Sequence, residues 1–380
     1  MDVDYRFVKS QSVDELRKIT EHHHLLDNPL VCKHYDNAYI LPHRHFNAGV
    51  VDSACNGVSG TQACERYKVG YPFDTPSVVV CDCDVIYMGY LKSVFGHCIT
   101  DNIKRIWFLY TAEFEKLKLN GIECVYVLPE DAELSPIFID MMKNIGIDVD
   151  KWRCVRQNTK FRRIYVPDSS LIYRDGERYW TNDFKETILR IKKAYSKFFT
   201  SESLLHKVYF SRSSFVDISH EVGEKDIEEV FEKNGFEIIH PESIPFVKQM
   251  QIVSQCSEFV ATEGSVSHWV VFCSPNTNVT ILRKADYVNT YQVVINEVAD
   301  VKVTYVDAHM SNVDKRWPWG GPFFLCKTPQ FCNFCGCSKW QVPYIITPKY
   351  LWYRFSNMSL VRKYISNRRI VKKLERFLYS

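Results

Sequence analysis

KVYFSRSS (Lys207–Ser214) and FVATEGSVSHWVVF (Phe259–Phe272) are the two stretches that decide the fold of this chain. Each begins with an apolar run of strand length and then turns to small polar residues. The first ends in Ser211-Arg212-Ser213-Ser214, and the second passes through Glu263-Gly264-Ser265 into a predicted helix. Backbone N–H groups at a helix start and an arginine guanidinium both attract an anion. The two motifs therefore predict an anion site, and the guest we expect is the diphosphate of a nucleotide.

The region around these motifs alternates between predicted strands and helices. The strands are Lys207–Phe210, Phe236–Ile239, Phe259–Thr262, Val279–Leu282 and Val301–Tyr305. The helices between them are Glu224–Lys233, Pro245–Gln255, Ser265–Phe272 and Tyr291–Glu297. This alternation predicts a parallel sheet covered by helices on both faces. Ligands of such sheets bind beyond the carboxyl ends of the strands, where both motifs fall.

The preceding part of the chain has a similar rhythm. We expect strands at Ser77–Met88, Cys124–Leu128 and Arg163–Val166, and helices at Thr100–Leu119 and Ser135–Asn144. An amphipathic helix, Asp183–Phe199, separates the two halves. The predicted fold class is α/β, with Rossmann-like domains at 76–200 and 201–310 facing a central cleft. Residues 1–75 form an irregular, β-rich opening region, 311–345 a segment rich in cysteine and aromatic residues, and 346–380 a basic tail.

The charge of the chain is unevenly distributed. The net charge is +3, from 48 Lys and Arg against 45 Asp and Glu. From Tyr350 onward there are eight basic residues and one acid, so the tail carries +7 and the remainder −4. This distribution argues against a nucleic-acid binder and is typical of a soluble enzyme with an electrostatic tether. Neither a signal sequence nor an apolar run of about 20 residues is present, so we expect a cytoplasmic protein.

The tail combines its basic residues with an apolar stripe. The stripe consists of Ile370, Val371, Leu374, Phe377 and Leu378. A basic amphipathic helix of this kind binds anionic lipid at a membrane surface, which predicts a peripheral position on the inner face of the cell membrane. The alternative is a terminal helix that packs on the body of the protein with its charges in solvent.

Two motifs of the sequence are candidate metal sites, a cluster of cysteines and a pair of aspartates. Most of the 14 cysteines lie in apolar runs, which indicates a reducing compartment without disulfides. Four of them, Cys326, Cys332, Cys335 and Cys337, are spaced closely enough for structural zinc or could be free thiols, and the sequence does not decide. Asp82-Cys83-Asp84 imitates a metal-binding DxD motif but lies in a predicted strand, far along the chain from Arg212. We expect no catalytic metal site and no cofactor.

His97 and Asp101 stand four residues apart at the start of a predicted helix, so both project from one face. A carboxylate and a histidine acting together suit the removal of a proton from an attacking hydroxyl. The alternative is a helix cap by Asp101, with His97 packed locally. Arg105 lies one turn further on the same face and is a candidate to bind an acceptor or a phosphate.

Four stretches in this order resemble glycosyltransferase family 61, and they resemble most its bacterial capsule or surface-polysaccharide branch. They are GHCITDNIKRIWFL (Gly96–Leu109), KVYFSRSS, GFEIIHPESIPFVKQMQIVSQC (Gly235–Cys256) and FVATEGSVSHWVVF, and the resemblance covers about residues 76–308. It implies an inverting enzyme with a GT-B-like twin Rossmann fold and a nucleotide-sugar donor bound by the C-terminal half. Eukaryotic members usually have His-Gly-Ala-Gly where this chain has Glu263-Gly264-Ser265-Val266, which implies that the base or sugar of the donor is recognised differently here.

The resemblance also implies roles for individual residues. Asp101 would be the base and His97 would orient it, while Arg212 would stabilise the leaving diphosphate. The other residues expected to bind the donor are Ser211, Ser213, Glu263, Gly264, Ser265 and His268. Each has a structural alternative: a surface ion pair for Arg212, a tight turn for the serines and the glycine, a helix cap for Glu263 and a packing role for His268.

The function predicted from this combination is an inverting transfer of sugar from a nucleotide-sugar donor. The acceptor would be a saccharide or a lipid-linked glycan, in the synthesis of a capsule or surface polysaccharide. Two alternatives remain at this point. One is a polysaccharide pyruvyl- or phosphoryl-transferase on a similar body, and the other is a non-catalytic module that binds glycan or nucleotide.

Overall fold

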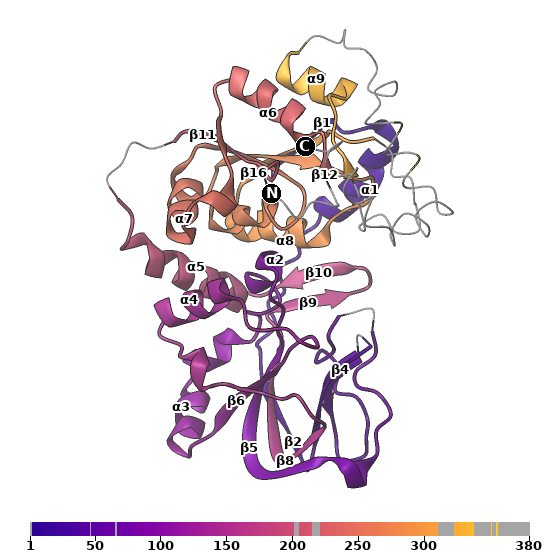
Figure 1. The fold of residues 1–380 in the computed structure, drawn as a ribbon, viewed down its shortest axis with the longest axis vertical. Coiled ribbons are helices and arrows are strands. Elements are labelled where there is room, and N and C mark those ends of the chain that lie inside the picture. The colour runs from indigo at the N-terminus through magenta and orange to yellow at the C-terminus, as the bar shows by residue number, and fades with distance from the viewer. Residues whose placement is uncertain are drawn as a thin grey trace, which may run out of the picture. The chain divides into compact units, whose positions relative to one another are not determined.

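The structure is a computed structural model and describes residues 2–45, 47–64, 67–200, 205–214, 221–310 and 323–337, with the single residues 351 and 355. The chain divides into two compact units. Unit 1 comprises Met1–His23 and Phe199–Ser380, and unit 2 comprises His24–Phe198. Each unit contains its own sheet (Figure 1).

Unit 1 is built on a sheet of six strands, all of them parallel. In spatial order these are β1 (Asp2–Phe7), β16 (Lys302–Asp307), β15 (Asn278–Arg283), β14 (Glu258–Thr262), β11 (Lys207–Phe210) and β13 (Glu237–Ile239). The five strands predicted from the C-terminal half are therefore confirmed, with ends shifted by at most two residues. The sixth, β1, comes from the opening segment, which the sequence analysis described only as irregular and β-rich.

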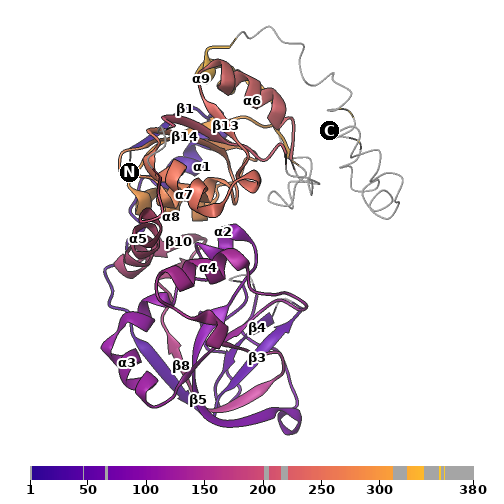
Figure 2. The same ribbon diagram turned by 60° about the vertical axis from the view of Figure 1, so that its left-hand side comes forward.

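Helices cover both faces of this sheet. Figures 1 and 2 show α6 (Glu224–Lys233) and α9 (Pro329–Cys335) on one face, and α1 (Ser10–Thr20), α7 (Phe246–Gln255) and α8 (Thr290–Ala299) on the other. The side chains between α6, α9 and the strands form an apolar core of Tyr209, Ile227, Val230, Phe231, Val260, Leu282, Val306, Ala308, Leu325 and Phe331. The predicted doubly covered parallel sheet is thus present in unit 1.

The strand order creates one particular position in this sheet. From β11 the chain crosses outward to β13, then returns past β11 to β14 and continues in the opposite direction through β15 to β16. The direction of winding therefore reverses between β11 and β14. In open sheets of this type, the crevice beyond the carboxyl ends of the strands at such a reversal is where ligands bind. Ser211-Arg212 and Glu263-Gly264 directly follow these two strands.

Unit 2 has a mixed sheet, not the purely parallel one expected for the first half. Its main path is β4 (Asn47–Val51), β3 (Tyr39–Arg44), β8 (Thr159–Pro167), β5 (Val79–Tyr90), β6 (Glu123–Val127) and β7 (Arg153–Cys154), and β2 (Cys32–Asp36) also pairs with β8. Pairing is parallel from β8 to β7 and antiparallel for β2, β3 and β4. For β3 and β4 the reason is local, because they are joined by a two-residue connection and parallel strands need a crossover of a dozen residues or more.

The helix predicted at Thr100–Leu119 is wrong as one continuous element. The chain instead forms α2 (Phe95–Cys98), a 3₁₀ turn at Ile106–Tyr110 and α3 (Ala112–Leu119). Asn102 is the main cause, because its side chain donates to the Lys92 carbonyl at 2.8 Å and accepts from the Lys92 N–H at 2.9 Å. Such side-chain bonds to the backbone compete with helix formation. The apolar residues at helical spacing are buried nonetheless, including Ile99, Ile103 and Ile106.

The remaining elements complete the two units. They are the helices α4 (Pro136–Asn144) and α5 (Asn182–Ser196), the strand pairs β9 (Leu171–Arg174) with β10 (Glu177–Trp180) and β12 (Glu221–Val222) with β17 (Phe323–Phe324), and the 3₁₀ turns Thr75–Ser77, Val149–Lys151, Pro241–Ser243 and Ser267–Phe272. The predicted tail at 346–380 lies outside the described residues apart from Leu351 and Phe355. Within the described part, every helix is too short or too polar to cross a bilayer.

Candidate active site

The carboxyl edge of the unit 1 sheet gathers charged side chains at one height. Thr262 is paired with Leu282, and Arg283 with Asp307, so Glu263, Arg283 and Asp307 lie on neighbouring strands at the same level. The Arg283 guanidinium Nη1 donates to Asp307 Oδ1 at 2.7 Å. His309 Nδ1 donates to the Arg283 carbonyl at 3.0 Å, and its other ring nitrogen, Nε2, lies 3.0 Å from Asp286 Oδ1. The carboxyl edge of the unit 1 sheet therefore contains buried polar and charged side chains, among them Arg283, Asp307 and His309.

Glu263 is the most unusual member of the group. Its side chain is 2% exposed, and its Oε2 has no hydrogen-bond partner among the described residues. Burial raises the pKa of this carboxyl to about 7, although Arg283, Lys284 and the main-chain N–H of Asn289 oppose the shift. Since a buried polar atom without a partner is costly, Glu263 is a candidate to accept a hydrogen bond from a ligand hydroxyl.

Gly264 occupies a backbone conformation that favours glycine, with φ of +138°. A Cβ built on it would lie 3.1 Å from the Lys284 Nζ, so the absence of a side chain lets the ammonium approach the turn. The Gly264 N–H, expected to face an anion, donates instead to Ser267 Oγ at 3.0 Å. The helix expected from Ser265 is a six-residue 3₁₀ turn that begins at Ser267.

The arginine motif lies at the end of β11. Arg212 is half-buried and stands two residues beyond Phe210, whose partner on β14 is Ala261. Two residues beyond that pair are Arg212 after β11 and Glu263 after β14. The two residues therefore lie at the same level where these neighbouring strands end. Ser211 is buried and its Oγ accepts from the Ser213 N–H at 3.0 Å, while Ser213 Oγ donates to Glu228 at 2.6 Å. Both serines therefore shape the turn that carries Arg212.

Ser265 and His268 follow the glycine. Ser265 is half-buried, and His268 is 7% exposed with its ring centroid 5.9 Å from that of Tyr291 in α8. Gln292 binds the same turn, because Ser267 Oγ donates to its side-chain oxygen at 2.5 Å. The turn after β14 is thus anchored on α8, and Ser265 is the more accessible of the two predicted residues.

In unit 2, His97 and Asp101 are in direct contact. His97 Nδ1 lies 2.6 Å from Asp101 Oδ2, and Lys92 Nζ lies 3.2 Å from the same oxygen. Burial raises the pKa of Asp101, but the Lys92 charge and the His97 hydrogen bond outweigh it and hold that pKa well below its ordinary value. The Asp101 side chain is 7% exposed and that of His97 is 32% exposed. An ionised carboxylate therefore holds a histidine that solvent can reach.

Arg105 belongs to the interior of unit 2. It is 2% exposed, donates from Nε to the Pro167 carbonyl at 2.9 Å and from Nη2 to the Gly60 carbonyl at 2.7 Å. Its guanidinium also lies over the Tyr87 ring, 5.7 Å from the centroid. These contacts give Arg105 a structural role, since it connects the loops of Gly60 and Pro167. We therefore leave it out of the site that we propose below.

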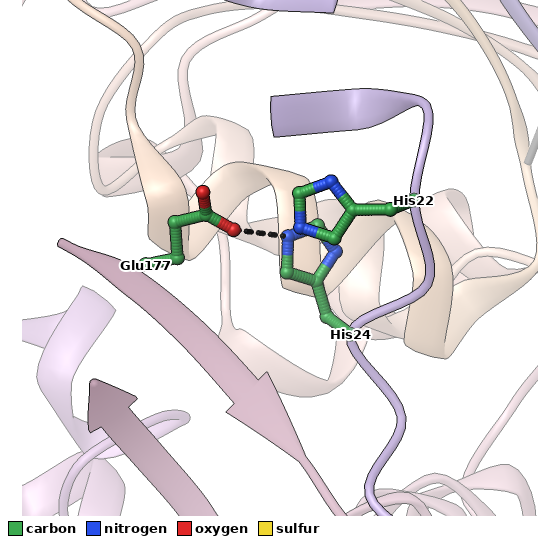
Figure 3. Close-up of side chains that lie close together, drawn as sticks. All are labelled: His22, His24 and Glu177. Atoms are coloured by element: carbon green, nitrogen blue, oxygen red, sulfur yellow. Dashed lines mark ion pairs between the residues drawn. The ribbon is translucent and has the colours of Figure 1, made fainter. Parts of the chain in front are cut away.

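The other polar motifs have structural partners. Arg162 Nε donates to Asp84 at 2.7 Å, and its Nη1 lies 3.9 Å from Asp82. His24 Nε2 lies 3.5 Å from Glu177 Oε2 in unit 2; Figure 3 draws this pair with His22, which belongs to unit 1.

The four clustered cysteines are free. Cys326 and Cys332 are buried, and burial raises the pKa of Cys326 and of Cys335 to about 12.

Several charged residues of the edge were missed by the sequence analysis. They are Lys9, Arg283, Lys284, Asp286, Asp307 and His309. One signal was available: Arg283 directly follows the predicted strand Val279–Leu282, Lys284 is one residue further, and Asp307 lies two residues beyond the predicted strand Val301–Tyr305. In a parallel sheet the residues at carboxyl ends meet at one edge, so reading every strand end would have found most of them.

Comparison with known families gives one match. The family model described as Glycosyltransferase 61 matches residues 95–280, a range that contains both the His97–Asp101 pair and the turns after β11 and β14. No curated protein matches the chain.

Proposed function

This chain belongs to the glycosyltransferase 61 family, and on that premise we propose that it is an inverting enzyme that transfers a sugar from a nucleotide-sugar donor to a saccharide acceptor. The observation that carries the proposal is the reversal of winding between β11 and β14, with Arg212 and the Glu263-Gly264 turn at the two strand ends. Such a position favours a nucleotide, and a guanidinium beside it favours the diphosphate.

Glu263 supports the same placement of the donor. A buried carboxyl oxygen with no partner among the described residues suits a hydroxyl of the donor ribose or sugar. Ser265 borders the same turn and adds a half-buried hydroxyl. The donor site that we propose therefore consists of Arg212, Glu263, Gly264 and Ser265, with Ser211, Ser213 and His268 supporting the two turns.

The proton transfer is assigned to the His97–Asp101 pair. The acceptor hydroxyl oxygen attacks the anomeric carbon, and the bond from that carbon to the donor phosphate breaks with its electron pair on the leaving phosphate. The hydroxyl proton passes to His97 Nε2, while Asp101 holds Nδ1–H and stabilises the imidazolium. We assign the base to His97, where the sequence analysis expected Asp101, because a carboxylate with a depressed pKa binds a proton weakly.

Charge on the leaving diphosphate would be stabilised by side-chain cations, so the reaction that we propose needs no metal. The acceptor would be a growing capsule or surface polysaccharide, and the basic tail at 346–380 would bring the enzyme to lipid-linked acceptors at a membrane.

A donor screen tests the proposal. UDP-, GDP- and CMP-linked sugars and phosphoenolpyruvate are compared by thermal shift, and the stabilising donor is then incubated with saccharide acceptors in chelator. We expect a nucleotide sugar to stabilise the protein and NMR to find the opposite anomeric configuration in the product. Stabilisation by phosphoenolpyruvate alone, or retention of configuration, would contradict the proposal.

A further inference from the structure

Lys284 stands where the donor diphosphate is proposed to bind. It follows β15 directly, and the pairing of Thr262 with Leu282 places it at the level of Gly264 on the adjacent strand. Its Nζ lies 3.1 Å from the position that a Cβ on Gly264 would occupy. The residue is 8% exposed, so its ammonium is held at the turn and does not extend into solvent.

Main-chain groups contribute less to this turn than the sequence suggests. The Gly264 N–H is engaged by Ser267 Oγ, and the following helix is a 3₁₀ turn of only six residues. A short turn contributes few aligned peptide dipoles, so it attracts an anion weakly. Positive charge for a diphosphate must therefore come mainly from side chains.

The surroundings of Lys284 hold its ammonium in place. Its Nζ lies over the Phe323 ring, 4.4 Å from the centroid, and a ring face attracts a cation without neutralising it. The neighbouring carboxyl of Glu263 has a pKa raised by burial to about 7, so near neutrality it carries only part of a negative charge. The Lys284 ammonium therefore attracts an anion, and the partly ionised Glu263 carboxyl repels that anion only weakly.

Arg212 and Lys284 flank the same strand end. In the sheet β14 lies between β11 and β15, so Arg212 follows the strand on one side of the Gly264 turn and Lys284 follows the strand on the other. Strands two apart in a sheet are about 10 Å from each other, a span that a diphosphate and two long side chains can bridge. We infer that Lys284 is a second donor-binding cation, which contacts the diphosphate of the nucleotide donor opposite Arg212; this inference rests on the donor site proposed above.

The test is binding of UDP and GDP to the full chain, measured by calorimetry, with uridine and guanosine as uncharged probes. We expect K284M to weaken nucleoside diphosphate binding about tenfold to a hundredfold, as loss of a charged hydrogen bond does. K284R, which keeps the charge, should restore affinity to within about threefold of wild type. Lys302 provides the matched control, since it is exposed at the opposite, amino end of the same sheet, and K302M should bind like wild type.

The outcomes separate this inference from the proposed function. If R212A weakens nucleoside diphosphate binding and K284M does not, the donor site stands and the inference fails. If the wild type binds neither nucleoside diphosphate, both fall together. K284Q is the second variant should K284M not fold, as judged by thermal unfolding. If neither variant folds, Lys284 serves stability and the inference is overturned.

Discussion

The Arg283 guanidinium lies 2.7 Å from the Asp307 carboxylate, and the two side chains are 1% and 0% exposed. This ion pair joins two neighbouring strands at the carboxyl edge of the unit 1 sheet. The second Asp307 oxygen accepts the main-chain N–H of Lys9 at 2.7 Å, which ties the chain leaving β1 to the same group. The Lys9 hydrogen bond therefore holds the segment that follows β1 against the carboxyl edge of the sheet that carries the candidate donor site.

Replacing Asp307 with Asn should destabilise unit 1. The change leaves the Arg283 charge buried without its counter-ion, and removal of one member of a buried pair typically costs about 3–5 kcal/mol of unfolding free energy. Urea unfolding followed by circular dichroism measures the effect. D300N is the matched control, because Asp300 is exposed and has a left-handed backbone that Asn tolerates. A loss for D307N no larger than that for D300N would contradict the structural role of the pair.

Replacing Glu263 with Gln should change how stability depends on pH. The folded pKa of Glu263 is raised to about 7 from an ordinary value of 4.5, so its favourable contribution is complete below pH 4.5 and is lost as the pH rises through 7. Gln stays neutral throughout. We therefore expect E263Q to match the wild type near pH 5 and to exceed it at pH 8 by up to about 3 kcal/mol.

Thermal unfolding from pH 5 to pH 8 measures this difference. The exposed Glu242 supplies the control, and E242Q should follow the wild type at every pH. Parallel curves for E263Q and wild type would mean that Glu263 ionises as an ordinary carboxyl.

Replacing Gly264 with Ala should impair both stability and donor binding. A φ of +138° strains any residue with a Cβ, at about 1–3 kcal/mol, and the new methyl group would displace the Lys284 ammonium. G235A separates the two effects, since Gly235 also has a positive φ but its Cβ would meet nothing within 4 Å. We expect both variants to melt earlier in thermal unfolding, whereas calorimetry should find weaker UDP or GDP binding only for G264A.

Replacing Asp101 with Asn should abolish transfer and spare donor binding. Asn keeps the shape of the side chain but cannot hold His97 Nδ1 protonated or stabilise the imidazolium, and a change of this kind costs about 10⁴-fold in rate. The measurement is the transfer rate with the donor found in the screen, alongside calorimetric affinity for its nucleotide. The exposed Asp150 gives the control variant D150N. Transfer by D101N at a rate near that of wild type would remove the pair from the mechanism.

The central strands of unit 1, β11, β14 and β15, were predictable because both of their faces are buried. A strand covered on both sides reads as an uninterrupted apolar run, such as the Val-Tyr-Phe that ends at Phe210 or the Phe-Val-Ala that begins at Phe259. The helical spacing of Ile99, Ile103 and Ile106 predicted the burial of these residues but not the local backbone structure. Those side chains are buried as expected, but Asn102 binds the backbone of Lys92 and interrupts the helix.

The amino-acid sequence by itself determined the alternation of strands and helices after Lys207 and the Arg212, Glu263 and Gly264 motifs, because each depends on residues close together in the chain. It also identified the family, whose model matches residues 95–280. Only the tertiary structure decided the order of the strands, the entry of β1 into the unit 1 sheet and the presence of Lys284 beside Gly264. These depend on which strands pair and in what register, and pairing energy comes from contacts between segments that are distant in sequence.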